Sequence, residues 1–239
     1  MKSPAAPNIR RLVLILGDQL DPNHPLVREL NPERDRVFMA EVREEATHVW
    51  SHKARIALFL AAMRHFRDHL RSRGITVQYL ALDRHTYVSL ATALAAELQA
   101  IRPTQVAMLQ AGDARVQTAI EKTVRQAGLS LDVAADPHFL IDGEAFRAWL
   151  AQRKQPRMEH FYRAMRKQTG ILMRDGKPMG GKCNYDNDIR CSFVRDVPSL
   201  LLPPPAFNTD STRREVIRLV NSDFPDHPGN LDDFDWPVT

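Results

Sequence analysis

The sequence predicts an α/β fold: a doubly wound, five-stranded, mainly parallel sheet of the Rossmann-like kind, followed by a helical and irregular C-terminal extension. The first observation is a set of short apolar runs without polar alternation, which is typical of strands covered on both faces. The second is that these runs alternate along the chain with helical patterns, as in parallel sheets. The third is a hydrophobic content of 44% over 239 residues, which is enough to build a buried core.

The first two strands are predicted over 11–16 and 36–41, with a short helix between them over 25–30. The first strand is an apolar run that leads directly into Gly17, Asp18 and Gln19. Ligands of open α/β sheets bind just outside the carboxyl ends of the strands. The residues that follow these two strands are therefore candidates for a binding site.

The rest of the α/β region follows from helical spacing and from helix-ending residues. Apolar residues recur every three or four positions after His52, and Gly74 stands where helices commonly stop. Asp113 is suited to cap a later helix, and Gly128 to end it. In chain order, we predict a helix over 52–73, a strand over 75–80, a helix over 86–101, a strand over 105–109, a helix over 113–127 and a strand over 129–133.

The pattern changes near residue 140, so we predict two parts. Residues 1–140 form the α/β domain, and residues 141–239 form a helical and irregular extension that includes an interdomain linker. Glycines and the run Pro203–Pro205 indicate irregular structure over 170–208. Within the extension, we predict helices over 142–153, 158–168 and 209–223.

Composition excludes several classes of protein. Lysine and arginine exceed aspartate and glutamate by 33 to 29, a mild excess that permits a nucleic-acid partner without indicating one. The chain has no apolar run of about 18 residues and no apolar segment near its start, so we expect a cytoplasmic protein with no membrane span. The two cysteines, Cys183 and Cys191, are not spaced like a redox pair or a zinc site. Two cysteines are also too few for an iron–sulfur cluster held by four cysteines.

Two polar groups follow the first two strands, and each has two interpretations. Gly17, Asp18 and Gln19 form either a tight turn or a polar rim for a heterocycle. Glu41 and Glu45 either accept hydrogen bonds from a bound ligand or belong to a solvated charge cluster. The sequence lacks the glycine-rich phosphate motifs and the nucleophile motifs of common enzymes. Residues and spacing alone thus predict a binding cleft but no reaction.

Other polar stretches have similarly open interpretations. His65 and His69 have the spacing of metal ligands on a helix, but a third ligand is not indicated, and a solvated pair is favoured. The stretch 157–166 interleaves aromatic and basic residues, which suits either a nucleic-acid contact or an amphipathic helix. Lys182 follows two glycines that could form a phosphate-binding turn.

Four segments of the chain resemble one known family. They are LVLILGDQL (12–20), residues 37–70, residues 159–186 and the closing FPDHPGNLDDFDWPVT (224–239). In this order they are similar to the amino-terminal part of photolyase-related proteins, the bacterial iron–sulfur cryptochromes and (6-4) photolyases.

The resemblance implies that the α/β domain holds an antenna chromophore, 6,7-dimethyl-8-ribityllumazine. In the family, a following helical domain binds FAD and a [4Fe–4S] cluster, and the whole protein performs light-driven DNA repair or photoreception. This sequence ends where that domain would begin, so we expect an antenna domain alone, as a fragment or as a naturally short relative. By itself it would lack FAD, the cluster and repair activity; its partners would be the helical domain and DNA, and its oligomeric state is not indicated.

The resemblance also assigns residues. For the chromophore, with Glu45 the strongest candidate, it implies a set drawn from the first two strand ends and the start of the long helix: Gly17, Asp18, Gln19, Glu41, Glu45, His48, His52 and Lys53. For a contact with DNA or the catalytic domain, it implies a set of basic and aromatic residues: Arg157, Tyr162, Arg163, Arg166 and Lys182. It implies no catalytic or metal-binding residue.

The chain departs from the family pattern at Cys183 and over 189–202. A stand-alone ligand-binding or interaction module and a nucleotide-binding transferase or hydrolase are the alternatives.

Overall fold

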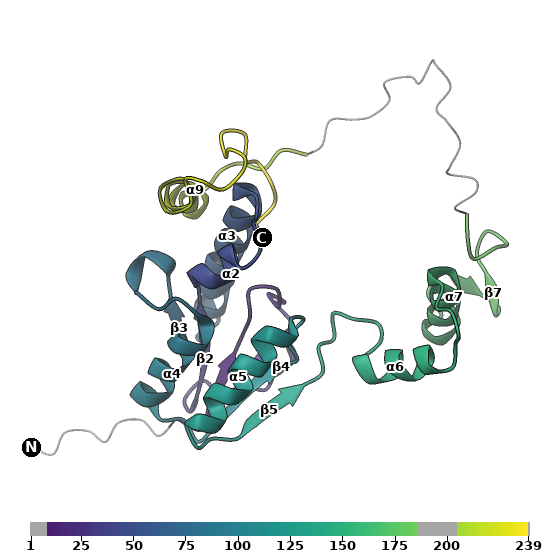
Figure 1. Ribbon diagram of the computed structural model, residues 1–239, viewed down its shortest axis with the longest axis horizontal. Helices are drawn as coiled ribbons and strands as arrows, with labels where there is room; N and C mark the ends of the chain where they lie inside the picture. Colours follow the sequence, from purple (N-terminus) through teal and green to yellow (C-terminus); the bar gives the residue numbers. More distant parts are fainter. Residues whose placement is uncertain (1–8, 186–204, 239) are drawn as a thin grey trace, which may run out of the picture. The chain divides into compact units, whose positions relative to one another are not determined.

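The structure is a computed structural model that describes residues 9–185 and 205–238. It confirms the α/β fold, in which helices flank a sheet (Figure 1). The sheet has five strands, all parallel, in the order β3-β2-β1-β4-β5. The strands are β1 (Arg11–Leu14), β2 (Asp35–Ala40), β3 (Val77–Leu80), β4 (Gln105–Leu109) and β5 (Leu131–Ala134).

The first strand lies at the centre of the sheet. Val13 is paired with Val37 of β2 on one side and with Ala107 of β4 on the other. The chain runs outward from β1 to β2 and β3, and then returns to place β4 on the opposite side of β1. The strand order therefore reverses between β1 and β4, which is the position where open α/β sheets bind ligands.

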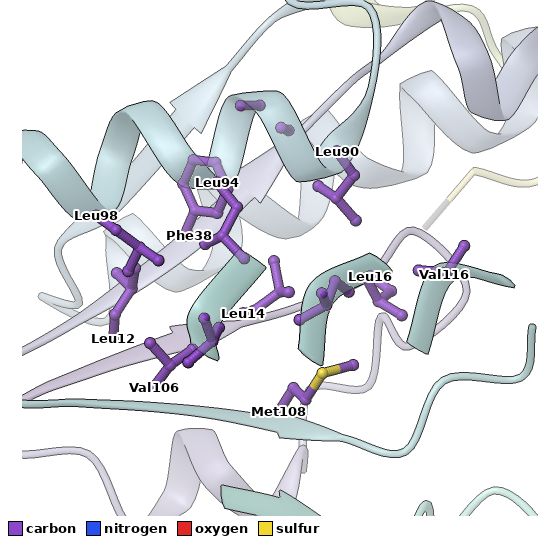
Figure 2. Packing of buried hydrophobic residues seen from close by; sticks show 14 of the residues in the cluster. Leu12, Leu14, Leu16, Phe38, Leu90, Leu94, Leu98, Val106, Met108 and Val116 are labelled. Carbon is purple, nitrogen blue, oxygen red and sulfur yellow. The ribbon is translucent and has the colours of Figure 1, made fainter. Parts of the chain in front are cut away.

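Helices cover both faces of the sheet. They are α1 (Pro25–Arg28), α3 (Lys53–Ser72), α4 (Leu90–Ile101) and α5 (Ala114–Gln126). Leu12, Leu14 and Phe38 pack with residues of α4 and α5 on one face, as Figure 2 shows. Val13 and Ile15 pack on the other face with residues of α1 and α3. This two-sided burial explains why the central strands β1, β2 and β4 read as nearly continuous apolar runs.

The caps of the helices agree with the residue types at their ends. The Asp113 side chain accepts a hydrogen bond from the Arg115 amide at 2.7 Å, as predicted for an N-cap. Gly74 has φ +76° directly after the last turn of α3, a conformation that glycine adopts without strain.

The helix α9 (Ser211–Asp223) packs against the first half of α3. Ala57 and Ala61 of α3 form one buried cluster with Val216 and Val220 of α9. Residues from Pro205 onward consequently belong to the same compact unit as the sheet. The sequence predicted instead that all residues after 140 form one extension.

A second compact unit comprises Ala135–Pro204. Its described elements are α6 (Gly143–Ala151), α7 (Met158–Thr169), β6 (Met173–Arg174) and β7 (Lys177–Pro178). The Phe161 ring meets the rings of Phe146 and Trp149 edge to face, with centroids 5.2 and 5.0 Å apart. The β6–β7 pair lies within a stretch predicted to be irregular. Cys191 and the segment 189–202 lie outside the described residues.

Two further differences from the predicted elements bear on the site. The helix α4 begins at Leu90 instead of residue 86, because a short 3-10 helix η1 (Leu82–Arg84) and extended residues come first. A five-residue helix, α2 (Arg43–Thr47), follows β2 and was not predicted; it has no buried residue and thus no apolar pattern. Among the described helices, none combines the length and hydropathy that crossing a membrane requires.

Candidate ligand-binding site

A cavity of about 280 Å³ lies at the carboxyl ends of β1, β2 and β4. It therefore occupies the place where the strand order reverses. Its lining residues come from the loops after these strands and from α2, α3, α4 and α5, and they are Ile15, Leu16, Gly17, Asp18, Ala40, Glu41, Val42, Glu45, Ala46, Ser51, Arg55, Ile56, Phe59, Leu60, Met63, Leu90, Ala111, Gly112, Asp113 and Val116.

The lining divides into a buried apolar part and an exposed polar part. Ile15, Met63 and Val116 are buried and belong to the apolar part. Most of the charged lining residues are exposed, and they are Asp18, Glu45, Arg55 and Asp113. A ligand in this cavity would thus meet both hydrocarbon and exposed charged groups, most of them carboxylates.

Glycine at position 17 keeps the cavity open beside α3. A Cβ atom added at Gly17 would lie 3.0 Å from Met63 Sδ and 3.6 Å from a Phe59 ring carbon. The 3.0 Å distance to Met63 Sδ is shorter than most real Cβ contacts, so a side chain at position 17 would push into the apolar wall. In the loop after β4, a Cβ atom at Gly112 would lie 3.4 Å from Asp18 Oδ2. The loop after β4 therefore approaches the Asp18 side chain at Gly112.

Glu41 is buried at the end of β2, and the protein itself occupies its carboxylate. Arg64 donates to Oε1 at 2.7 Å and to Oε2 at 2.9 Å, the Tyr79 hydroxyl donates to Oε1 at 2.5 Å, and the Leu82 amide donates to Oε2 at 2.8 Å. These four bonds match the acceptor capacity of a carboxylate. Glu41 thus joins β2, α3, β3 and η1 behind the cavity wall, and is not part of a solvated cluster.

This buried cluster changes the acid–base behaviour of its members. Burial, followed by the charge and hydrogen bond of Glu41, raises the pKa of Tyr79 well above its usual range. Burial alone would lower the pKa of Arg64, but its hydrogen bonds and charge attraction with Glu41 raise that pKa overall. Tyr79 therefore remains a neutral donor and Arg64 a cation.

Glu45 lies on α2 at the exposed side of the cavity, where Arg115 of α5 binds it. Arg115 Nη2 is 3.0 Å from both carboxylate oxygens of Glu45 and 3.3 Å from Asp113 Oδ2. The pKa of Asp113 is lowered, mainly by the hydrogen bond from the Arg115 amide. The Asp113 carboxylate is therefore ionised. Arg115 thereby links α2 to the start of α5 beside the cavity.

The structure places the other predicted chromophore residues outside the lining. Gln19 is buried, and its Nε2 donates to the Gln110 carbonyl at 2.9 Å, which ties the loop after β1 to the loop after β4. His48 is exposed at the end of α2. His52 Nδ1 accepts from the Ala54 amide at 3.0 Å and caps α3.

Lys53, the last of the predicted set, is tied to the C-terminal segment, since its amide donates to the Pro228 carbonyl at 2.9 Å. Of the eight predicted residues, the cavity therefore brings together Gly17, Asp18, Glu41 and Glu45. The sequence missed Gly112 and Asp113 as lining residues. They follow β4 as Gly17 and Asp18 follow β1, but the neighbouring position of β4 depends on a strand order that the sequence does not reveal.

A second hollow, of about 690 Å³, lies between α4 and α5. Its lining includes alanines such as Ala95 and Ala119 together with Arg102 and Lys122, and none of its lining residues is acidic or aromatic. Although it is larger, it offers a ligand neither ring-stacking surfaces nor carboxylate acceptors. We therefore take the cavity at the strand ends as the candidate site.

The predicted contact residues of the second unit have different surroundings. Arg157 precedes α7, and Arg163 is exposed on it, as is Tyr162. Arg166 is buried, donates to the Leu172 carbonyl and lies over the Tyr162 ring, 5.6 Å from its centroid. Lys182 Nζ lies 4.9 Å from the Tyr185 ring centroid. Arg157 and Arg163 are thus better placed than Arg166 to meet an external partner.

A metal site is not indicated by the described residues, which contain no group of three or more His, Cys, Asp or Glu side chains able to hold an ion. His65 Nε2 lies 3.0 Å from Asp210 Oδ2, and the His69 ring stacks on Phe66 with centroids 6.3 Å apart. The two histidines thus have separate partners.

Comparison with known proteins relates the whole α/β region to one family. A family model described as "deoxyribodipyrimidine photo-lyase-related protein" matches residues 13–236. A curated protein named (6-4) photolyase from Agrobacterium fabrum (strain C58 / ATCC 33970) is 36% identical over 231 residues. The match covers 96% of this chain and 45% of that protein, so the chain spans about half the length of its curated relative.

Proposed function

Because the chain belongs to the deoxyribodipyrimidine photo-lyase-related protein family, we propose that its cavity at the strand ends binds an antenna chromophore, 6,7-dimethyl-8-ribityllumazine. The observation that carries the proposal is the composition of the cavity, whose lining combines buried apolar residues with exposed carboxylates at the switch point of the sheet. A flat heterocycle with a hydroxylated tail has matching surfaces.

The volume and walls fit the ring system. Ligand pockets generally enclose about 300–1,000 Å³, and this cavity, at about 280 Å³, is near the lower bound. It suits a two-ring system better than a larger chromophore. Phe59 and Met63 provide aromatic and thioether surfaces for ring contacts, and Ile15 provides an aliphatic one.

The polar lining fits the tail and the ring edge. Carboxylates accept hydrogen bonds and do not donate them, so Asp18 and Glu45 suit ligand O–H and N–H groups. Glu45 retains capacity for a ligand, because among the described residues one Arg115 nitrogen donates to it and a carboxylate offers about four acceptor positions.

The buried residues behind the wall would keep the ligand in a fixed orientation. Glu41 and its partners join β2, α3, β3 and η1 beneath the cavity, so the wall is rigidly supported. When bound, a lumazine absorbs light and can transfer the excitation energy to a second chromophore. The domain itself needs no general acid or base for this role.

We extend the proposal to the longer proteins of the family. In a protein that also carries the family's helical domain, with FAD and a [4Fe–4S] cluster, this antenna would serve light-driven DNA repair or photoreception. Arg157, Tyr162, Arg163 and Lys182 are our candidates for contact with that domain or with DNA, together with Arg166 as a support for Tyr162.

A fluorescence titration tests the chromophore proposal. The purified chain is mixed with increasing 6,7-dimethyl-8-ribityllumazine, and fluorescence anisotropy reports the bound fraction. We expect saturable binding of one ligand per chain. Absence of binding by a chain whose circular dichroism shows a folded α/β domain would contradict the proposal.

A further inference from the structure

The charges around the cavity are unusual for a site at a sheet switch point, where phosphorylated ligands are common. Three exposed carboxylates line it, from Asp18, Glu45 and Asp113, and Arg55 is the only cation among its lining residues. Arg115 lies nearby, but its guanidinium is within 3.3 Å of both Glu45 and Asp113. A phosphate entering this space would face a net negative field.

The start of α5 is also closed to an anion. The first-turn amides of a helix form a common phosphate site, because they point outward at the positive end of the helix dipole. Here the Asp113 carboxylate accepts the Arg115 amide at 2.7 Å. The protein has thus placed its own anion where a ligand phosphate would bind.

The start of α3 offers no better position, although Ser51 and Arg55 beside it line the cavity. The Lys53 amide donates to the Pro228 carbonyl at 2.9 Å, and the Arg55 amide to the His52 carbonyl at 3.0 Å. The Ala54 amide donates to His52 Nδ1 at 3.0 Å. The first three amides of this helix are therefore already bound to acceptors of the chain.

From these contacts we infer that the cavity selects an uncharged polyol tail and rejects the same ligand carrying a terminal phosphate. The inference rests on the proposed function, because it concerns the same cavity and the same ring system. It adds a selectivity: the cavity discriminates against a nucleotide-like phosphate ester of the same ribityl compound. Asp18 and Asp113 determine this selectivity by electrostatic repulsion.

A matched pair of ligands tests the inference. The chain is titrated with 6,7-dimethyl-8-ribityllumazine and with its 5′-phosphate, at low ionic strength, by fluorescence anisotropy. We expect the phosphate ester to bind at least about tenfold more weakly, and added salt to reduce the difference because it screens exposed charges. Equal affinities would overturn the inference and leave the proposed function intact, whereas binding of neither ligand would overturn both.

A double variant identifies the residues responsible. Asp18→Asn with Asp113→Asn removes two charges, and asparagine caps helices as well as aspartate does, so α5 keeps its start. We expect the affinity ratio of the two ligands to fall several-fold in this variant. The matched control is Asp136→Asn with Asp142→Asn, which removes two charges from the second unit and should leave the ratio unchanged. An unaltered ratio in the Asp18 and Asp113 variant would overturn the inference.

Discussion

Arg64 and Glu41 form a buried, two-point ion pair beneath the cavity, with nitrogen–oxygen distances of 2.7 and 2.9 Å. The pair joins the middle of α3 to the carboxyl end of β2, the strand beside the centre of the sheet. The two side chains are only 3% and 0% exposed. Removal of one therefore leaves the other charge buried, with neither its ion-pair partner nor water to stabilise it. This relationship is the basis of the first prediction.

Replacing Arg64 by methionine should destabilise the fold strongly. The change leaves the Glu41 carboxylate buried without its main partner, which costs about 3–5 kcal/mol. Urea unfolding followed by circular dichroism measures the loss. The matched control is Arg67→Met on the same helix, whose partner Asp68 is half-exposed; exposed pairs contribute about 0–1 kcal/mol. Equal losses in the two variants would contradict this account of Glu41.

Tyr79 should make stability depend on pH in the alkaline range. Its pKa in the folded protein is raised, so above pH 10 the unfolded chain loses the phenol proton while the folded chain keeps it. The unfolding free energy should therefore fall as pH rises, by up to about 1.4 kcal/mol per pH unit. In Tyr79→Phe this contribution is missing, so the stability advantage of the wild type should shrink from pH 9 to pH 11. A constant difference would show that Tyr79 is not shielded as described.

Glu45 should contribute to chromophore affinity through its acceptor oxygens. Glu45→Gln keeps the shape but weakens acceptance of ligand hydrogen bonds, and a bond to a charged group is worth about 1.5–3 kcal/mol. We expect binding of the lumazine to weaken at least about tenfold. Glu44→Gln is the control, because Glu44 is adjacent on α2 and lies 3.6 Å from Arg115 but does not line the cavity. Equal effects of the two changes would remove Glu45 from the site.

Gly17 should be needed for the space of the cavity. A leucine side chain at this position would begin 3.0 Å from Met63 Sδ and extend along the apolar wall, so Gly17→Leu should abolish lumazine binding. Gly74→Ala is the control for general destabilisation, since a side chain at φ +76° is strained by about 1 kcal/mol. Gly74 lies beyond the C-terminal end of α3 and does not line the cavity. The Gly74→Ala change should lower the midpoint of urea unfolding and leave the affinity unchanged. Retained binding in Gly17→Leu would place the ligand elsewhere.

Much of the sheet could be predicted from local sequence, because burial on both faces leaves a clear apolar signal. β4 has the predicted bounds, 105–109, and Asp113 caps α5 as expected. α2 was missed because a five-residue exposed helix has no periodic pattern. The packing of α9 on α3 joins residues about 160 positions apart, and local patterns do not report such contacts.

The site was predictable only in part, because local patterns do not report contacts between residues that are distant in the sequence. Gly17 and Asp18 follow an apolar strand, so the rule of strand ends identifies them. For Glu41 the solvated-cluster interpretation is wrong, because its carboxylate is buried and bonded to Arg64 and Tyr79. These partners are 23 and 38 residues away in the sequence, so local patterns did not indicate them. That Asp113 lines the same cavity as Asp18 depends on the strand order β2-β1-β4.

The location of the bound chromophore tests the central claim most directly. Methyl groups of isoleucine, leucine, valine, alanine and methionine can be labelled, and their NMR shifts followed while 6,7-dimethyl-8-ribityllumazine is added. We predict large ring-current shifts at Ile15, Met63 and Val116, which line the cavity at the strand ends, and unchanged shifts at Ala95 and Ala119, which line the hollow between α4 and α5. Shifts confined to the second pair, or no shifts at the first three residues under saturating ligand, would contradict the account.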